Sequence, residues 1–394
     1  MELKNGVHLG YCTNIHRGED WEETFAGLRD YTLRVKERVC PTGERYGIGL
    51  RLSAQAAQEL WEEEAMSAFR RWLDDNDCYV FTINGFPYGK FHGTRVKEQV
   101  YAPDWTSSLR LEYTEQLFQI LVRLLDGEDA SLGGSVSTLP GSFKEFVTDE
   151  TQVDAICMTL RLCAETVQRL AEESGRDLHL GLEPEPLGLF ETTPETVEFF
   201  GRLTEGVSDR EAFLKVMGVN YDTCHLGVEY EEAEAALGRL REAGLRVSKL
   251  HLSSALRLEP TGEVLELLKG FDEEVYLHQV VVREGDAVVE RLRDLPEAFA
   301  WAEEKGGAGN LGDEWRVHFH VPLHASPAAP FGDTRDHLEG VLGVMEREPG
   351  LCSHVEMETY TWEVLPAGMQ EGDVVDQLVK EYEWTLGELR GRGF

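Results

Sequence analysis

The stretch LHLGLEPEPLGLFETTPETVEFFGRLT, residues 178–204, contains one unit of the pattern that recurs along this chain. Its first part, Leu178–Glu183, is short and β-rich, which indicates a buried strand. Its last part, Thr193–Thr204, has apolar residues at three- and four-residue spacing, as an amphipathic helix does. Thr193 can cap this helix, and Pro194 suits its first turn. The stretch therefore predicts a strand followed by a helix.

The same order of strand and helix repeats along the chain. This order predicts a parallel sheet covered by helices, and about eight units are the count of a (β/α)8 TIM barrel. A doubly wound open sheet is the alternative. The predicted strands are Val7–Asn14, Gly47–Leu52, Tyr79–Asn84, Gly134–Thr138, Leu178–Glu183, Gly218–Asp222, Val247–Leu252, Arg316–Val321 and Ser353–Thr359. The predicted helices are Asp20–Lys36, Ala54–Asp74, Ser107–Leu125, Thr151–Ser174, Thr193–Thr204, Glu229–Ala243, Thr334–Glu346 and Gly372–Leu389.

The chain is longer than a barrel needs. It has 394 residues, whereas a barrel core takes roughly 250. We therefore expect residues 1–394 to form a single barrel domain with an insertion at 257–312, between the predicted strands Val247–Leu252 and Arg316–Val321. The insertion has its own predicted strand, Val275–Val282, and helix, Leu295–Lys305.

The charge of the chain excludes several classes of partner. The chain has 38 Lys and Arg residues and 73 Asp and Glu residues, which gives a formal charge of −35. Such an acidic chain is not expected to bind nucleic acid or an anionic membrane surface, since both need a basic face. Its apolar stretches are too short to span a membrane, and its start has no apolar core of a secretory signal. The seven scattered cysteines predict reduced thiols and a cytoplasmic protein.

Carboxylates and imidazoles gather where five successive predicted strands end. The carboxyl ends of barrel strands form the active-site mouth, and alternate residues of a strand share a face. Buried charges there need partners or a metal, and a mixed set of carboxylates and imidazoles suits Mn²⁺, Co²⁺, Zn²⁺ or Mg²⁺. Taken singly, a histidine near a strand end is usually a satisfied core residue, and a glutamate there is usually a helix cap or a solvated group. The residues are Glu183, Glu185, Asp222, His225, His251, His318, His320, Glu356 and Glu358.

Two of these segments carry a resemblance. LEPEPLGLFE, residues 182–191, and DTCH, residues 222–225, resemble motifs of the xylose isomerase-like, or AP endonuclease-like, superfamily of metal-dependent TIM barrels. The resemblance implies one divalent ion, with Glu191 and His225 near the substrate. The ligands that it implies are Glu185, Asp222, His251 and Glu358, with Glu183, Glu356, His318 and His320 as alternatives.

Three further segments narrow the resemblance. Residues 8–16, 81–89 and 356–362 are similar to the EboE family of metabolite traffic proteins, a branch of the same superfamily. That branch is associated with bacterial gene clusters for the movement or processing of secondary metabolites. The chain departs from the DNA-repair branch of the superfamily at one motif. That branch has Asp-x-His where this chain has His318-Phe319-His320, so the sequence argues against a three-zinc nuclease.

The predicted function is a metal-dependent isomerase or epimerase of a sugar or sugar-like small molecule, acting through an enediolate. Glu185 and Glu358 would exchange a proton with the substrate, and His225 would hydrogen-bond a substrate oxygen. One alternative is a metal-dependent hydrolase of a small phosphoester, in which the histidines at 318, 320 and 324 bind a second ion. The other is a metabolite-binding barrel without catalysis. The remaining predicted substrate contacts are Asn84, His92 and Arg257.

Overall fold

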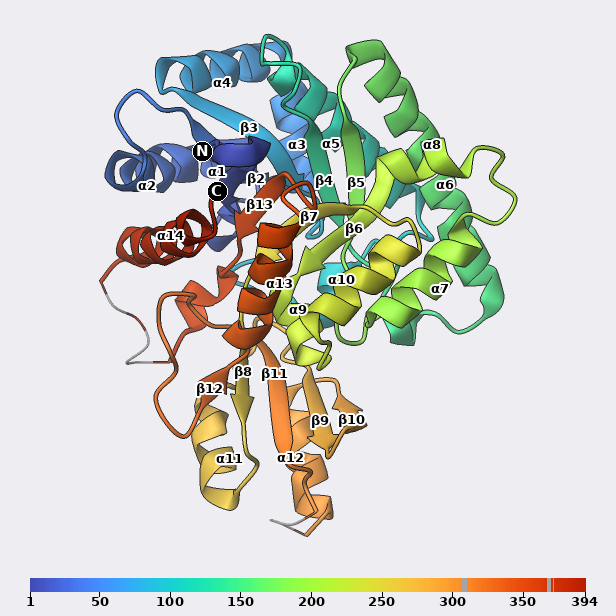
Figure 1. Cartoon of the computed structure of the whole chain (residues 1–394), viewed down its shortest axis with the longest axis vertical. Coiled ribbons are helices and arrows are strands. Elements are labelled where there is room, and N and C mark those ends of the chain that lie inside the picture. Colours follow the sequence, from blue (N-terminus) through green and yellow to red (C-terminus); the bar gives the residue numbers. More distant parts are fainter. Residues whose placement is uncertain (307–309, 367–369, 371) are drawn as a thin grey trace.

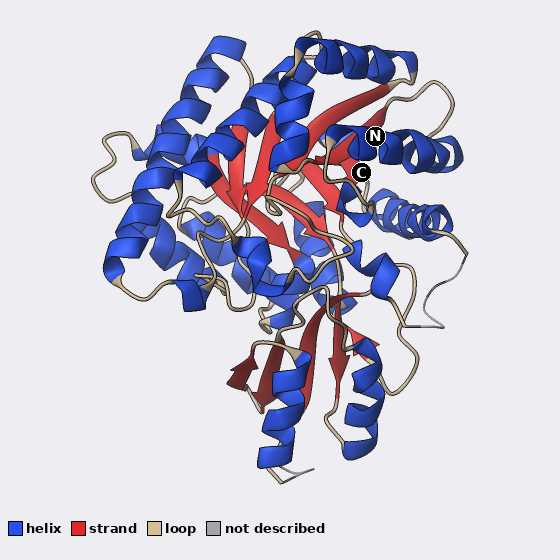
Figure 2. Ribbon diagram, turned by 180° about the vertical axis from the view of Figure 1, so that it is seen from behind, coloured by secondary structure: helices blue, strands red, loops and turns tan. Residues whose placement is uncertain are grey.

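The computed structural model describes residues 1–306, 310–366, 370 and 372–394. Its centre is a nearly closed barrel of eight parallel strands surrounded by helices (Figures 1 and 2). A parallel bridge between Cys12 and Gly49 joins the two edges of the sheet. The strands, in sheet order, are β1 (His8–Tyr11), β13 (His354–Met357), β7 (Val247–Leu252), β6 (Met217–Asp222), β5 (Leu178–Leu182), β4 (Gly134–Thr138), β3 (Cys78–Asn84) and β2 (Tyr46–Arg51).

All residues of these eight strands are buried, as expected for a parallel sheet that helices cover. The predicted TIM barrel is therefore confirmed. The helices around it are α1 (Trp21–Gly27), α2 (Leu33–Val39), α3 (Ala54–Trp61), α4 (Glu63–Asp75), α5 (Ser108–Leu125), α6 (Glu150–Ser174), α7 (Thr193–Leu203), α8 (Arg210–Val216), α9 (Thr223–Val228), α10 (Ala233–Glu242), α13 (Arg335–Arg347) and α14 (Val374–Gly391).

The helix ends follow local side-chain chemistry. Helix α6 begins at Asp149, whose carboxylate accepts from the backbone N–H groups of Thr151 and Gln152, and ends at Gly175, which has a φ of 68°. Helix α7 is capped by Thr192. The prediction that Thr193 caps α7 was wrong by one residue, since Thr193 already lies inside the helix.

Between β7 and β13 the chain leaves the barrel and forms a second, antiparallel sheet, which lies below the barrel in Figure 1. Two helices, α11 (Gly262–Leu268) and α12 (Leu295–Glu304), pack on one face of it (Figure 2). Its separate apolar core includes Leu256, Val280 and Trp315. The strands, in sheet order, are β10 (Ala287–Leu292), β9 (Val280–Glu284), β11 (Glu314–His320), β8 (Ala255–Leu258) and β12 (Gly332–Asp333).

The second sheet corrects one sequence prediction. Arg316–Val321 was expected to be a barrel strand, but β11 pairs antiparallel with β8 and β9, and β13 pairs directly with β7. A β-rich segment has the same local pattern in either sheet, so the sequence does not show which strands it pairs with. The second sheet takes its strands from residues 255–333, a wider range than 257–312. Residues 307–309 of that range lie outside the described part of the chain.

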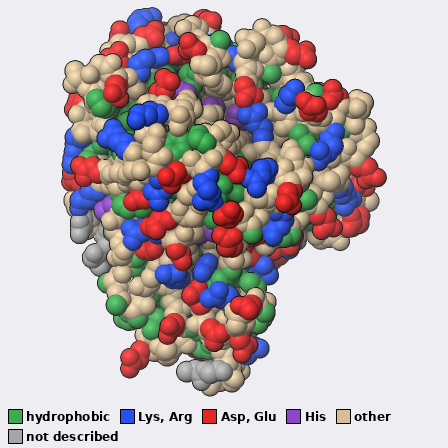
Figure 3. Space-filling model, viewed as in Figure 1, with side chains coloured by type: hydrophobic (Ala, Val, Ile, Leu, Met, Phe, Trp, Pro, Cys, Tyr) green, Lys and Arg blue, Asp and Glu red, His purple; other side chains and the backbone are tan. Residues whose placement is uncertain are grey.

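Charged side chains of both signs are scattered over the face of the molecule that Figure 3 shows. Figure 3 shows the acids and bases interspersed over the visible face, with no single region holding the excess acid. Within the described part of the chain, no helix is long and apolar enough to cross a membrane. All seven cysteines are free thiols.

Candidate metal centre

A buried group of four side chains lies at the carboxyl ends of β5, β6, β7 and β13. One ligand atom from each lies within 4.8 Å of the corresponding atoms of the other three. The group consists of three carboxylates and one imidazole, a donor set that suits a divalent ion. Its members, all buried, are Glu183, Asp222, His251 and Glu358.

Asp222 presents one satisfied oxygen and one free oxygen. Its Oδ1 accepts from the backbone N–H groups of Cys224 at 2.7 Å and His225 at 3.1 Å, and from Oγ of Ser253 at 2.6 Å. Its Oδ2 is buried, has no hydrogen-bond partner in the described structure, and lies 3.5 Å from Nδ1 of His251. Burial alone would raise the pKa of Asp222, but the neighbouring His225 and His251 hold it well below its usual range.

Glu358 is held by two asparagines. Its Oε1 accepts from Nδ2 of Asn14 at 2.8 Å and from Nδ2 of Asn84 at 3.1 Å, which leaves Oε2 3.1 Å from Nδ1 of His251. The Asn84 amide is itself fixed, because its Oδ1 accepts from the backbone N–H of Phe86 at 3.0 Å. One Glu358 oxygen is thus occupied by protein donors and the other faces the group.

His251 is oriented from both sides of its ring. Nδ1 lies 3.0 Å from Oε1 of Glu183, and Nε2 lies 3.1 Å from Oε2 of Glu356. Burial favours the neutral ring, yet the charges of Glu358 and Glu183 raise the pKa of His251 well above its usual range. A histidine that gives its outer N–H to a carboxylate presents its other nitrogen to a metal in a fixed orientation.

Glu356 carries its charge in the barrel interior because a lysine accompanies it. Nζ of Lys249 lies 2.5 Å from Oε2 of Glu356, and both side chains are fully buried. Burial would raise the pKa of Glu356, but Lys249 and His251 lower it to about 2. A Cβ at Gly49 would lie 1.7 Å from Oε1 of Glu356, so only glycine fits at that position.

The structure places Glu183 in the four-residue group and Glu185 in a neighbouring one, with His225 and His318. Oε1 of Glu185 is buried and has no hydrogen-bond partner in the described structure. Burial, together with the charges of Glu183 and Asp222, raises the pKa of Glu185 well above its usual range. The sequence left the choice between Glu183 and Glu185 open, because the prolines beside them obscure which carboxylate points inward.

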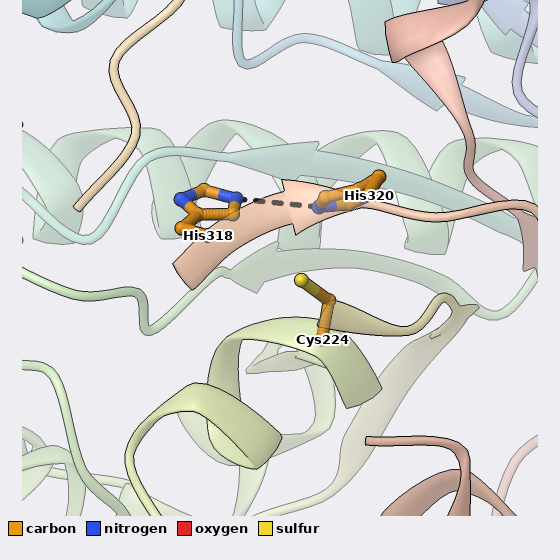
Figure 4. Close-up of side chains that lie close together, drawn as sticks. All are labelled: Cys224, His318 and His320. Carbon is orange, nitrogen blue, oxygen red and sulfur yellow. Dashed lines mark hydrogen bonds between the residues drawn. The ribbon is translucent and has the colours of Figure 1, made fainter. Parts of the chain in front are cut away.

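A second cluster adjoins the first. It brings Cys224 of α9 together with His318 and His320 of β11, and Figure 4 shows the thiol and the two rings. Nε2 of His318 lies 3.2 Å from Nε2 of His320. His225 packs edge-on against His318, with the ring centres 4.5 Å apart.

The hydrogen bonds of His318 and His320 fix where their protons lie. Nδ1 of His320 is 2.8 Å from the backbone oxygen of Glu358, which can only accept. Nδ1 of His318 is 2.8 Å from Oε1 of Gln279, whose amide is oriented by its own donation to the backbone oxygen of Pro186. Both rings therefore donate through Nδ1, and their Nε2 atoms face each other at the 3.2 Å contact.

His318 and the neighbouring His225 are held neutral by burial. Burial and the nearby His225 lower the pKa of His318 well below its usual range. Burial likewise lowers the pKa of His225 to about 4, while its Nδ1 lies 3.2 Å from the backbone oxygen of Pro184. Two imidazole nitrogens that face each other at 3.2 Å form a site where a proton or a metal ion can bind between them.

A cavity of about 550 Å³, counted with part of its opening to solvent, lies over both clusters. Polar side chains line its floor, among them Asn84, Glu183, Glu185, His225, His318 and Glu358.

Three predicted substrate contacts lie outside the cavity lining. Glu191 is tied to Lys144 and to Nε of Arg291, which is 3.2 Å away. His92 hydrogen-bonds the Tyr276 hydroxyl and the backbone oxygen of Asn14. Arg257 lies on β8 of the second sheet, where its Nη1 is 3.1 Å from Asp336. Asn84 does line the cavity, and there it also holds Glu358.

Sequence reasoning missed three functional side chains. Lys249 shares a strand face with His251, two residues later, so strand alternation could have indicated it. Asn14 follows the first barrel strand, and its position at a strand end was the available signal. Gln279 lies in the insertion, and only the paired sheet shows that it meets His318.

Comparison with protein-family models found no match, and neither did comparison with curated protein sequences. Among solved structures, an L-ribulose 3-epimerase is similar at 12% identity, over 98% of this chain and 95% of the other, with a TM-score of 0.50. An IolI protein with a bound zinc atom is similar at 11% identity, over 98% and 99% of the two chains, also with a TM-score of 0.50. These likenesses show that the chain has the fold of xylose isomerase-like TIM barrels.

Proposed function

We propose that Glu183, Asp222, His251 and Glu358 bind one divalent metal ion. The observation that carries the proposal is Oδ2 of Asp222, which is buried, lacks a hydrogen-bond partner in the described structure and faces the other three donors. An unpaired carboxylate oxygen is costly in a protein interior unless a cation compensates it. Glu183 takes the place that the sequence analysis gave to Glu185.

We propose that the activity is isomerisation or epimerisation of a small hydroxycarbonyl compound of the carbohydrate type. The ion, when bound, would supply a Lewis acid that polarises a carbonyl oxygen and its neighbouring hydroxyl. Glu183 and Glu358 come from β5 and β13, which β6 and β7 separate in the sheet. They can therefore face the substrate from two directions, one removing the proton next to the carbonyl and the other returning it. Asn14 and Asn84 hold Glu358 for this role.

Two structural neighbours agree with this proposal. One is an L-ribulose 3-epimerase and the other binds zinc. We also propose, from the sequence similarity of three segments, that the chain belongs with the EboE branch and acts in the cytoplasm on a secondary metabolite.

Metal content tests the ligand set. The purified chain is loaded with Mn²⁺, Co²⁺ or Zn²⁺, and bound metal is measured by plasma mass spectrometry after dialysis. We expect one equivalent of metal in the parent. The affinity for this metal should fall more than tenfold in Asp222→Asn and in Glu358→Gln. Glu381→Gln, a buried carboxamide replacement on α14, is the matched control and should bind metal as the parent does. Normal metal binding by both site variants would contradict the ligand set.

The grouping of Cys224, His318 and His320, with the two Nε2 atoms facing each other, favours a second candidate, a hydrolase of a small phosphoester that uses two ions. In a two-ion site the second ion would bind the imidazoles and stabilise the leaving oxygen. Stoichiometry separates the two functions: two equivalents, falling to one in His318→Gln, support hydrolysis. One equivalent in both proteins supports isomerisation. Tight metabolite binding without metal and without turnover would instead support a carrier role.

A further inference from the structure

The cavity over the metal centre has two contrasting surfaces. Its floor is polar, as described above, whereas its upper walls are apolar and largely aromatic. Most of the accessible lining is apolar. Free sugars expose hydroxyl groups on nearly every carbon, so contact with such apolar walls adds little to their binding affinity. The wall residues include Phe86, Phe91, Val96, Tyr101, Tyr276 and Tyr360.

The aromatic walls are built from segments far apart in the chain and are held together by hydrogen bonds. The backbone N–H groups of Val96 and Lys97 both donate to the backbone oxygen of Val275 at 2.9 Å. The Tyr276 hydroxyl lies 2.5 Å from Nδ1 of His92. Phe91, Val96, Tyr276 and Tyr360 form a small apolar cluster of their own. The walls are thus preformed rather than assembled around a ligand.

The described lining of the cavity has no free Lys or Arg side chain for a phosphate. Of the described lining residues, Lys97 alone has a permanent positive charge, and its side chain is 6% exposed. Its Nζ lies 2.8 Å from Oδ2 of Asp294 and donates to the backbone oxygen of Glu273 at 2.8 Å. Carboxylates of the floor face the same space. A phosphate there would meet negative charge without a free Lys or Arg to bind it.

We propose that the substrate is an uncharged hydroxycarbonyl compound with an apolar body, not a sugar phosphate. The inference rests on the proposed function for the floor, where the oxygen atoms of the substrate would bind. The apolar body packs against the aromatic walls, chiefly Phe91 and Tyr276, and its burial supplies affinity that a bare polyol lacks.

Three α-hydroxyketones and one α-aminoketone test this. They are 2-hydroxyacetophenone, dihydroxyacetone, dihydroxyacetone phosphate and 2-aminoacetophenone, titrated into the full chain by ligand-observed NMR, once with EDTA and once with Zn²⁺. We expect 2-hydroxyacetophenone to bind at least tenfold tighter than dihydroxyacetone, and the phosphate to bind no tighter than dihydroxyacetone. Tighter binding of the phosphate or of the ammonium compound would overturn the proposal, as would absence of binding by all four.

Variants of the wall locate the effect. Phe91→Leu and Phe91→Ala should reduce the advantage of the aromatic ligand to threefold or less without weakening dihydroxyacetone. Tyr31→Ala removes an exposed aromatic ring outside the cavity and should leave the ranking intact. An unchanged advantage in both Phe91 variants would overturn the proposal. If the ligands keep the expected order of affinity but Zn²⁺ changes none of the affinities, the result supports an uncharged substrate. The same result contradicts the proposed metal chemistry.

Discussion

The barrel half of the candidate site contains compensated charges, whereas the half from the second sheet contains histidines whose Nδ1 atoms bond uncharged oxygen atoms. In the barrel, Lys249 offsets Glu356, and further carboxylates surround His251. In the second sheet, His318 and His320 donate only to uncharged oxygen atoms. The two halves meet where Nδ1 of His320 donates to the backbone oxygen that follows β13.

This contrast indicates how each half responds to the loss of a partner. Removal of one member of a buried ion pair leaves the other charge without compensation, which costs several kcal/mol. Removal of a neutral acceptor leaves only one hydrogen bond unmade, which costs less. The barrel half should therefore be far less tolerant of substitution, although both halves are equally buried.

The largest effect is expected from Lys249→Met, which leaves Glu356 charged and unpaired inside the barrel. The free energy of unfolding should fall by about 3–5 kcal/mol, measured by urea denaturation at pH 7. Gln279→Leu removes the neutral acceptor of His318 in the second sheet and should cost about 1–3 kcal/mol.

A double variant isolates the charge. Lys249→Met combined with Glu356→Leu removes both members of the pair and should recover most of the lost stability. If the double variant is no more stable than Lys249→Met alone, the cost arises from packing rather than from the uncompensated carboxylate.

A smaller effect is expected from adding one methyl group at a glycine in each half. Gly49→Ala places Cβ 1.7 Å from Oε1 of Glu356 and 2.8 Å from the backbone oxygen of Tyr11, so the ion pair must move. We expect a loss of about 3 kcal/mol in unfolding free energy. Gly332→Ala in the second sheet meets only the flexible side chain of Arg257, at 3.0 Å, and should cost less than about 1 kcal/mol. Equal losses of unfolding free energy in the two variants would contradict the expected difference in tolerance between the barrel half and the second sheet.

The barrel could be predicted from sequence because its information is local. Each strand-and-helix unit, such as 178–204, has its own periodicity and its own start signals. Strand β11 has equally clear periodicity, yet it lies in the other sheet, because strand pairing depends on the path of the chain between β7 and β13. Local pattern indicates what an element is and leaves open what it pairs with.

The candidate site divides in the same way. The structure brings together Asp222, His251 and Glu358, whose positions at strand ends were visible in the sequence. The sequence did not show whether Glu183 or Glu185 is the metal ligand, because the direction of the backbone after β5 depends on contacts made around Pro184. It also could not show that Lys249 faces Glu356, because that pair joins two strands 107 residues apart.

The smallest effect concerns the contact between the barrel and the second sheet, where His92 hydrogen-bonds the Tyr276 hydroxyl. Burial lowers the pKa of His92 to about 4, against about 6.5 in an unfolded chain. The unfolded chain therefore takes up this proton first, and the stability that His92 contributes is present above pH 6.5 and is lost as the pH falls toward 4. Between pH 7 and pH 5 the parent should lose about 1–2 kcal/mol more unfolding free energy than His92→Gln. Hydrogen exchange at the amides of Val96 and Lys97 should accelerate over the same pH range in the parent alone, after correction for intrinsic exchange. If the unfolding free energy of the parent and of His92→Gln changes equally with pH, protonation of His92 does not weaken the contact between the barrel and the second sheet.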